Sequence, residues 1–471
     1  MFNFDLNNKE YNHIHFIGIG GISMSGLAEI LLNKGYKVTG TDLKDNPILK
    51  RLEKLGATIY IGHSKNNING ADLIIYTDAI STDNEELQAA RQSGIPTVDR
   101  AMFLGALMKN YTYSIAVSGT HGKTTTTSMI ASITNHGTLD PTILLGGELD
   151  DIGGNVKLGS QDYILTEACE YKGNILKYFP TTAIILNIDE DHLDYFRDID
   201  HIVDTFAGYA ANLEEDSYLL INGDDPHAPK IIESTKAQVV KFGISHKAHY
   251  RAENISFSKE GYPSFTLNIN NKEFWPINLK VMGKHNIYNA LASIAAAHIH
   301  GVSMEDITDY IELYNGVHRR LEVKGLVKDI KIMDDYAHHP TEIKATLDAL
   351  RDVPKNKLYC IFQPHTFTRT KALLDKFASS FMNADQIIIT DIYAARENDN
   401  GEIHSKDLVQ AINDKGADAI YLSTFEEVKK YLMLNIEAGD IVLTMGAGNV
   451  CQIGDLLLDK LSNKSNEKAA V

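Results

Sequence analysis

Ser114-Ile-Ala-Val-Ser-Gly-Thr-His-Gly-Lys-Thr-Thr125 is the most informative segment of this 471-residue chain. Residues 114–117 are typical of a buried strand, and the residues after Lys123 follow a helical pattern. The turn between them is shorter than the G-x-x-x-x-G-K-[ST] motif. Its backbone amides can still surround phosphates, Lys123 can neutralise charge, and the Thr124 hydroxyl can bind Mg²⁺. We therefore predict a phosphate loop that binds ATP through Gly119, Thr120, His121, Gly122, Lys123, Thr124 and Thr125.

The regions on both sides of this loop alternate short β-rich runs with longer helical patterns. This alternation is typical of parallel sheets with crossover helices, so the predicted class is α/β. A single core stops growing near 250–300 residues, roughly, so we expect three domains. They are a Rossmann-like domain at residues 1–109, a P-loop ATPase-like domain at 110–318 and a second Rossmann-like αβ domain at 319–471. The segment 250–281 alternates like antiparallel strands, which predicts a mixed central sheet.

The composition excludes several classes of function. A hydrophobic fraction of 44% and a charged fraction of 23% are those of soluble proteins, and no run approaches the ~18 apolar residues of a membrane helix. The start of the chain lacks the features of a secretory signal, so we expect a cytoplasmic protein. A formal net charge of -17 argues against nucleic-acid binding. Three cysteines without metal-ligand spacing fit a reducing compartment.

A second glycine turn, Gly18-Ile-Gly20-Gly21-Ile-Ser23, follows the strand-like run HIHFI, and Asp42 follows the next strand. Such a turn lets backbone amides approach a pyrophosphate, with the acidic residue on a ribose. Ser23 occupies the third glycine position, so the strict dinucleotide pattern fails. From the residues alone, a plain strand-to-helix turn is an equal alternative.

Polar side chains also follow two other central strands. Glu167 ends the run YILT, and Asp191-His192 lies just beyond TTAIILN. Because open αβ sheets build their sites at the carboxyl ends of strands, these groups are placed to complete Mg²⁺ coordination beside the phosphate loop. An isolated residue of this kind would more often be a helix cap or a solvated loop residue.

Three later segments carry further candidates. Asn286 and Asn289 open a helix three residues apart, and their amides suit either adenine or helix capping. Arg320 belongs to a pair of guanidinium groups beside a glycine turn, where it could reach a phosphate. In the last domain, Tyr336 and His338 follow one predicted strand, and His365 and Arg369 follow another, so these polar side chains are expected at the same edge of the sheet.

Taken in chain order, these motifs resemble the Mur ligase family over nearly the whole sequence. The resemblance rests on GIGGISMSG, GTHGKTTT, EACE, NIDEDHLD, GKHNIYNALA, GVHRRLE, DDYAHHPTE and QPHTFTRT. Within the family, the N-terminal glycine turn, DDYAHHP and PHTFTRT are similar to those of members that add L-alanine to UDP-N-acetylmuramate. Thr366 and Ala337 depart from the residues frequent in relatives, arginine and glycine respectively.

The resemblance implies a reaction and a set of roles. ATP would activate the muramate carboxylate as an acyl phosphate, which the amine of L-alanine then attacks; Mg²⁺ is the expected metal, and a monomer or weak homodimer the expected assembly. The implied catalytic residues are Lys123, His192, Arg320, His338 and Arg369. The implied metal ligands are Thr124, Glu167 and His192, and adenine would lie against Asn286 and Asn289. The UDP-sugar would contact Gly18, Gly20, Gly21, Ser23 and Asp42, and the amino acid would contact Tyr336, His338 and His365.

Three other functions compete with this one. A recycling ligase that attaches a preformed murein tripeptide to the same sugar nucleotide shares most of these motifs. A nicotinamide-dependent oxidoreductase could use the first glycine turn, but it would leave the loop at Lys123 and Thr124 unexplained. A UDP-sugar sensor with a decayed ATPase is opposed by the intact Lys123, Thr124, Glu167 and His192.

Overall fold

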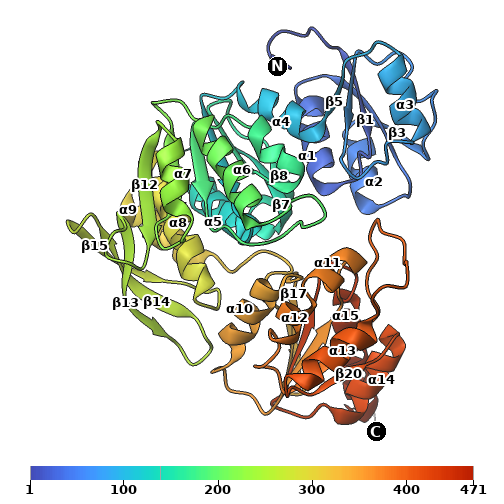
Figure 1. Cartoon of the computed structure of the whole chain (residues 1–471), viewed down its shortest axis with the longest axis vertical. Helices are drawn as coiled ribbons and strands as arrows, with labels where there is room; N and C mark the ends of the chain where they lie inside the picture. Colours follow the sequence, from blue (N-terminus) through green and yellow to red (C-terminus); the bar gives the residue numbers. More distant parts are fainter. Residues whose placement is uncertain (1, 138, 470–471) are drawn as a thin grey trace. The chain divides into compact units, whose positions relative to one another are not determined.

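The computed structural model describes residues 2–137 and 139–469, which form three sheets flanked by helices (Figure 1). The predicted α/β class and the three-part architecture are confirmed. None of the helices in the described part of the chain combines the length and the hydropathy of a membrane span.

The N-terminal sheet has the strand order β3-β2-β1-β4-β5, and all its neighbouring strands run parallel. This order places β1 centrally, so the turn that follows β1 lies where the order of the strands reverses. Open αβ sheets bind their ligands at this position. The strands are β1 (His13–Ile17), β2 (Lys37–Asp42), β3 (Thr58–Ile61), β4 (Leu73–Tyr76) and β5 (Thr97–Asp99), and the helices are α1 (Ile22–Asn33), α2 (Pro47–Lys54), α3 (Glu85–Gln92) and α4 (Arg100–Met108).

The central sheet is mixed, as predicted, with the order β15-β14-β13-β12-β11-β10-β6-β9-β7-β8. Its middle strands run parallel, whereas β14 and β15 pair antiparallel, as do β7 and β8. The strands are β6 (Tyr113–Ser118), β7 (Thr142–Leu149), β8 (Gly154–Lys157), β9 (Tyr163–Glu167), β10 (Thr182–Ile185), β11 (Tyr218–Asn222), β12 (Gln238–Gly243), β13 (Tyr250–Phe257), β14 (Pro263–Ile269) and β15 (Glu273–Asn278). The α-helices of this region are α5 (Lys123–His136), α6 (Ile199–Ala211), α7 (Ala228–Ser234), α8 (His285–Ile299) and α9 (Met304–Leu313).

The C-terminal sheet has the order β16-β17-β21-β18-β19-β20, with β16 antiparallel to β17 and the other pairs parallel. The strands are β16 (Glu322–Val327), β17 (Ile330–Asp335), β18 (Leu358–Phe362), β19 (Gln386–Ile389), β20 (Ala419–Tyr421) and β21 (Ile441–Met445). The helices are α10 (Pro340–Leu350), α11 (Phe367–Ala372), α12 (Leu374–Ala378), α13 (Ser405–Asp414), α14 (Phe425–Asn435) and α15 (Cys451–Ala469).

Strand β18 of the C-terminal sheet is buried on both faces, which explains why it is continuously apolar. In β18, Leu358, Cys360 and Phe362 belong to one hydrophobic cluster, while Tyr359 and Ile361 belong to the cluster on the opposite face. Successive side chains of a strand point to opposite faces, so a strand covered on both sides needs apolar residues at every position.

The contacts between residues divide the chain into two compact units. The first unit is Met1–Asp189 with Ile199–Arg251 and Asn289–Tyr310, and the second is Glu190–Asp198 with Ala252–Tyr288 and Ile311–Val471. The predicted domain boundaries, after residues 109 and 318, stay predictions.

Candidate functional site

The loop between β6 and α5 has the backbone that a phosphate-binding turn requires. Gly119 has a φ of +129° and Gly122 a φ of +86°, conformations that favour glycine. A Cβ atom on Gly122 would lie 2.7 Å from Asn289 Oδ1, so a side chain there would collide with α8. Gly122 caps α5 without a side-chain acceptor. The backbone amides of the first turn of α5 can therefore serve an anion.

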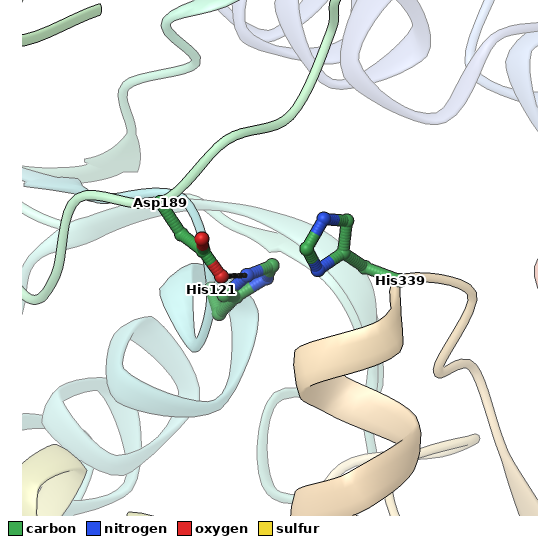
Figure 2. Close-up of side chains that lie close together, drawn as sticks. All are labelled: His121, Asp189 and His339. Atoms are coloured by element: carbon green, nitrogen blue, oxygen red, sulfur yellow. Dashed lines mark hydrogen bonds and ion pairs between the residues drawn. The ribbon is translucent and has the colours of Figure 1, made fainter. Parts of the chain in front are cut away.

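The exit of β10 holds this loop in place. The backbone N–H of Thr120 donates to Asn187 O (3.0 Å), and that of His121 donates to Asn187 Oδ1 (2.8 Å). Asp189 closes the contact, because its N–H donates to Thr120 Oγ1 (2.9 Å) and its carboxylate lies 3.2 Å from His121 Nε2. Figure 2 shows the His121–Asp189 interaction as a dashed line. The His121 side chain thus fixes the loop from within the first unit.

Lys123, the first residue of α5, points its ammonium group back into the loop. Its Nζ donates to Thr120 O (3.0 Å) and to Glu170 Oε2 (3.0 Å), and also to Gly119 O. Burial alone would lower the pKa of Lys123, but the neighbouring Glu170 carboxylate holds that pKa above its ordinary value. Lys123 is therefore a cation in the folded protein, as charge neutralisation at a phosphate requires.

Thr124 and Glu167, two of the predicted metal ligands, lie in contact beside the loop. Parallel pairing of β6 and β9 sets Val117 beside Glu167. The Thr124 hydroxyl donates to Glu167 Oε2 (3.0 Å), and the Gly146 N–H donates to Glu167 Oε1 (2.6 Å). A hydroxyl and a carboxylate are hard oxygen donors, the type that Mg²⁺ prefers, so this pair fits the expected metal.

The third predicted metal ligand, His192, belongs to the segment Glu190–Asp198 of the second unit. It has a positive φ of +55°, and its N–H donates to Asp191 Oδ1 (2.7 Å). An imidazole nitrogen is a less usual Mg²⁺ donor than an oxygen. The role of His192 as a ligand stays a prediction.

Asp191 forms a buried ion pair with Arg369. Arg369 Nη2 lies 3.0 Å and Nε 3.2 Å from Asp191 Oδ1. The Asp191 side chain is 8% exposed and that of Arg369 is 12% exposed. Burial would raise the pKa of Asp191, but His192 and Arg369 together hold it well below its usual range. Arg369 is thereby fixed in orientation within the second unit.

The residues predicted to bind the amino acid come together around Arg369. Arg369 Nη1 lies 3.2 Å from His365 Nδ1, and the rings of His365 and His338 have centroids 5.7 Å apart. The Tyr336 ring lies edge-on to His338 at 5.5 Å, and the Arg320 guanidinium lies 4.9 Å from the Tyr336 centroid. All of these residues belong to the second unit.

Partial burial keeps both imidazoles of this group neutral. It lowers the pKa of His338 to about 4 and that of His365 to about 3, from an ordinary 6.5. At neutral pH these side chains can therefore accept or donate hydrogen bonds but carry no charge. In this group, Arg369 and Arg320 supply the positive charge that a carboxylate of an amino acid would need.

These pKa values predict how stability depends on pH. Between pH 6.5 and about 4 the unfolded chain binds more protons at His338 than the folded chain does, so the free energy of unfolding falls as the pH falls. We expect roughly 1–2 kcal/mol less stability at pH 5 than at pH 7 from this one group. Urea unfolding of the parent and of His338→Gln at both pH values would measure it.

The pH 7 comparison is the internal control for that experiment, because at pH 7 the substitution changes packing without changing charge. At pH 7 any difference in the free energy of unfolding between parent and variant reflects packing alone. Between pH 7 and pH 5 the free energy of unfolding should fall less in the variant than in the parent. An unchanged drop would show that His338 is not held neutral in the folded protein.

The two asparagines of the GKHNIYNALA motif have different surroundings. Asn289 is 5% exposed, and its Oδ1 accepts from Thr126 Oγ1 (3.2 Å), which places it against α5 and the phosphate loop. Asn286 is also 5% exposed, but its Nδ2 donates to Met282 O (2.7 Å). Both amides thus have hydrogen bonds within the protein, and the predicted contacts with adenine stay predictions.

The N-terminal glycine turn is tied to the end of β2. Gly18 has a φ of +84°, and its N–H donates to Thr41 O (2.9 Å). The N–H of Gly20 donates to Asp42 Oδ2 (2.9 Å), and a Cβ atom on Gly20 would lie 2.7 Å from that oxygen. Asp42 therefore shapes the turn, and Gly20 must be glycine for this approach. The predicted contacts of the turn, Gly21 included, with a UDP-sugar stay predictions.

Two residues beside these motifs are not predicted as site residues by the sequence. Arg100, the first residue of α4, donates from Nη1 to Ser23 Oγ (3.1 Å), so a guanidinium lies at the N-terminal turn. Glu170 contacts Lys123, although in the sequence it stands out only as the last residue of EACE. Arg100 follows the end of a strand, the same signal that identifies Glu167. Glu170 lies three residues past a strand end, and its contact with Lys123 has no signature in the sequence.

Comparison with known proteins gives consistent matches along the chain. A model of the Mur ligase family catalytic domain matches residues 13–112, one of the Mur ligase middle domain matches residues 117–297, and one of the Mur ligase glutamate ligase domain matches residues 319–448. Together the matched segments cover all three sheets.

Curated relatives are similar over nearly their full length. The UDP-N-acetylmuramate–L-alanine ligase of Acetivibrio thermocellus is 52% identical over 454 residues, which are 96% of this chain and 97% of the relative. The ligase of that name from Clostridium acetobutylicum is 49% identical over 97% of this chain and 100% of its own.

Solved structures show the same likeness. The UDP-N-acetylmuramate–alanine ligase of Thermotoga maritima superposes with a TM-score of 0.81 at 29% identity, over 96% of this chain and 99% of that one. A murein peptide ligase from Psychrobacter arcticus superposes with a TM-score of 0.72 at 27% identity, again over 96% and 99%.

Proposed function

Because the chain belongs to the Mur ligase family, we propose that it joins L-alanine to UDP-N-acetylmuramate and converts ATP to ADP and phosphate as it does so. The observation that carries a phosphoryl-transfer step is the loop in which Lys123 and the Thr124–Glu167 pair lie side by side. L-alanine and UDP-N-acetylmuramate are proposed as the substrates because the curated relatives carry the name of that ligase. About half of the aligned residues are identical between this chain and those relatives, over nearly their full length. The reaction would supply a precursor for peptidoglycan synthesis.

The proposed reaction has two chemical steps. A muramate carboxylate oxygen attacks the γ-phosphorus of ATP, and the bond between the γ-phosphorus and the bridging oxygen of the β-phosphate breaks. ADP departs, and the muramate carboxylate has become an acyl phosphate. The neutral amine of L-alanine then attacks the acyl carbon, and the tetrahedral intermediate collapses to an amide with loss of phosphate and of the amine proton. Phosphoryl transfer of this kind depends mainly on positioning and on neutralising charge.

The residues of the first unit are assigned to the nucleotides. We assign the β- and γ-phosphates to Lys123 and to the amides of residues 119–125. Thr124 and Glu167 would hold Mg²⁺, which when bound would neutralise phosphate charge. The N-terminal turn with Ser23 and Asp42 is assigned to the UDP-sugar, and the Ser23–Arg100 contact supports an anion there, because Arg100 brings positive charge to the turn.

The residues of the second unit are assigned to the amino acid. A carboxylate suits a guanidinium, and Arg369 is held by Asp191 with its Nη1 beside His365. The side chain of L-alanine would lie against the Tyr336, His338 and His365 rings, which are neighbours of one another. The amine must be neutral to attack, and the neutral imidazole of His338 is our candidate for accepting its proton.

The test is phosphate release from MgATP and UDP-N-acetylmuramate with L-alanine, with no amino acid, or with the murein tripeptide. We expect release that depends on L-alanine, together with the mass of UDP-N-acetylmuramoyl-L-alanine. Release with the tripeptide alone would identify the recycling ligase instead. No release under any condition would refute both and favour a sugar-nucleotide sensor.

A further inference from the structure

The lysine of the phosphate loop is held by a carboxylate to which the proposed reaction gives no part. Lys123 Nζ lies 3.0 Å from Glu170 Oε2 and 3.3 Å from Oε1, and it also donates to Thr120 O and Gly119 O. A lysine ammonium has three protons to donate. All three are directed at acceptors of the protein, so Lys123 can donate to a phosphate only by giving up one of them.

Glu170 is the acceptor that a phosphate would replace. Gly119 O and Thr120 O belong to the loop itself and stay beside Lys123 as long as the loop keeps its shape. Glu170 comes from the chain after β9, at the start of the short 3-10 helix Tyr171–Lys177, and its carboxylate oxygens are anionic like those of a phosphate. The Glu170 side chain is 2% exposed and that of Lys123 is 16% exposed, so water screens the pair little.

Two carboxylates from the segment 167–170 therefore accept hydrogen bonds from Thr124 and Lys123 of the loop. Glu167 accepts from Thr124, and Glu170, three residues later, accepts from Lys123. The first carboxylate would remain in place as a metal ligand. The second has no such use, and once phosphates are bound its negative charge would lie close to theirs.

We propose that Glu170 is the resident counter-anion of Lys123, a positioning residue that holds the ammonium when nucleotide is absent and releases it to the phosphates when nucleotide binds. The proposal rests on the proposed function only in that the loop binds ATP and ADP. Exchange of one anionic acceptor for another keeps Lys123 paired throughout, but it makes Glu170 oppose nucleotide binding. Glu170 thereby limits affinity for the product ADP and favours its release.

The test is Glu170→Gln, which removes the negative charge and keeps the size of the side chain and one oxygen acceptor. We expect MgADP to bind the variant about tenfold more tightly, equivalent to roughly 1.4 kcal/mol, mostly through slower dissociation. AMP lacks the β-phosphate and should bind the parent and the variant equally. Titration calorimetry without acceptor substrates measures both affinities, and thermal melting checks that the variant is folded.

A double-mutant cycle with Lys123→Met shows whether Glu170 acts through the lysine. In the Lys123→Met background, Glu170→Gln should tighten MgADP binding by less than it does in the parent, because the competition for the ammonium is gone and only the direct repulsion between Glu170 and the phosphates is relieved. Glu214→Gln is the matched control, since Glu214 pairs with Lys236 on the exposed surface of the same unit and the substitution changes net charge equally. This control should leave MgADP affinity unchanged.

The outcomes separate this proposal from the proposed function. If the parent binds MgADP and Glu170→Gln binds it equally or more weakly, the counter-anion role is wrong while the ligase remains. If the parent does not bind MgADP, the ATP-dependent function fails and the proposal falls with it. Should Glu170→Gln not fold, Glu170→Ser removes the same charge and leaves room for water, and it must also tighten binding.

Discussion

Replacing Lys123 with methionine is expected to lower alanine-dependent phosphate release about 1,000-fold or more, the range seen when a single group that stabilises transition-state charge is removed. The reason is geometric. Lys123 is the cationic side chain whose ammonium lies within the turn between Gly119 and Gly122. Methionine fills a similar volume but offers no proton and no charge. Phosphate release with saturating substrates, compared between parent and variant, measures the effect.

This substitution also removes the partner of a buried carboxylate, so loss of activity must be separated from loss of folding. Breaking one half of a buried ion pair costs roughly 3–5 kcal/mol. Lys123→Met alone should therefore melt at a lower temperature than the parent. Lys123→Met combined with Glu170→Gln removes both charges and should recover much of that stability while remaining inactive. Activity in the folded double variant would contradict the role given to Lys123.

Replacing Glu167 with glutamine is expected to lower the same rate at least about 100-fold at millimolar Mg²⁺ and to raise the Mg²⁺ concentration needed for half-maximal rate. Glutamine keeps an oxygen that can accept from Thr124 or Gly146, so the strand end should keep its shape. It removes the negative charge on which binding of a hard divalent cation depends. A titration of phosphate release against Mg²⁺ separates weaker metal binding from a slower reaction.

Two controls make this result specific. Glu233→Gln removes one negative charge from an exposed position on α7 and should leave the Mg²⁺ dependence unchanged. Thr124→Ala removes the hydroxyl that contacts Glu167 and should shift the Mg²⁺ dependence in the same direction, but by less, because a neutral ligand is lost. An unchanged Mg²⁺ dependence in Glu167→Gln would rule out the carboxylate as a metal ligand.

The parts of the candidate site that are local in sequence can be predicted from the order of the residues alone. The phosphate loop, Thr124 and Glu167 follow strands whose carboxyl ends meet at one edge of a parallel sheet, and the register of β6 with β9 brings them together. Tyr336, His338, His365 and Arg369 also follow strand ends of one domain and form one group. Periodicity and the rules for strand ends suffice for such residues.

Contacts that depend on how segments pack cannot be predicted in this way. Arg100 reaches Ser23, 77 residues earlier, and Asp191 reaches Arg369, 178 residues later. Neither pair has a characteristic spacing, since each depends on the side of a helix or loop that the packing turns inward. The roles of Asp42 in shaping the glycine turn and of His121 in holding the phosphate loop have the same origin.

The α/β class, the three sheets, the phosphate loop and the family follow from the order of the residues, because alternating strand and helix patterns and glycine turns act over short stretches of chain. The electrostatic state of the groups in these sites, by contrast, arises from the packing of the folded chain. Partial burial makes His338 neutral, His192 and Arg369 keep Asp191 ionised, and Glu170 holds the ammonium of Lys123. The charge of a side chain depends on its solvation and on its neighbours in space, and no linear pattern specifies either.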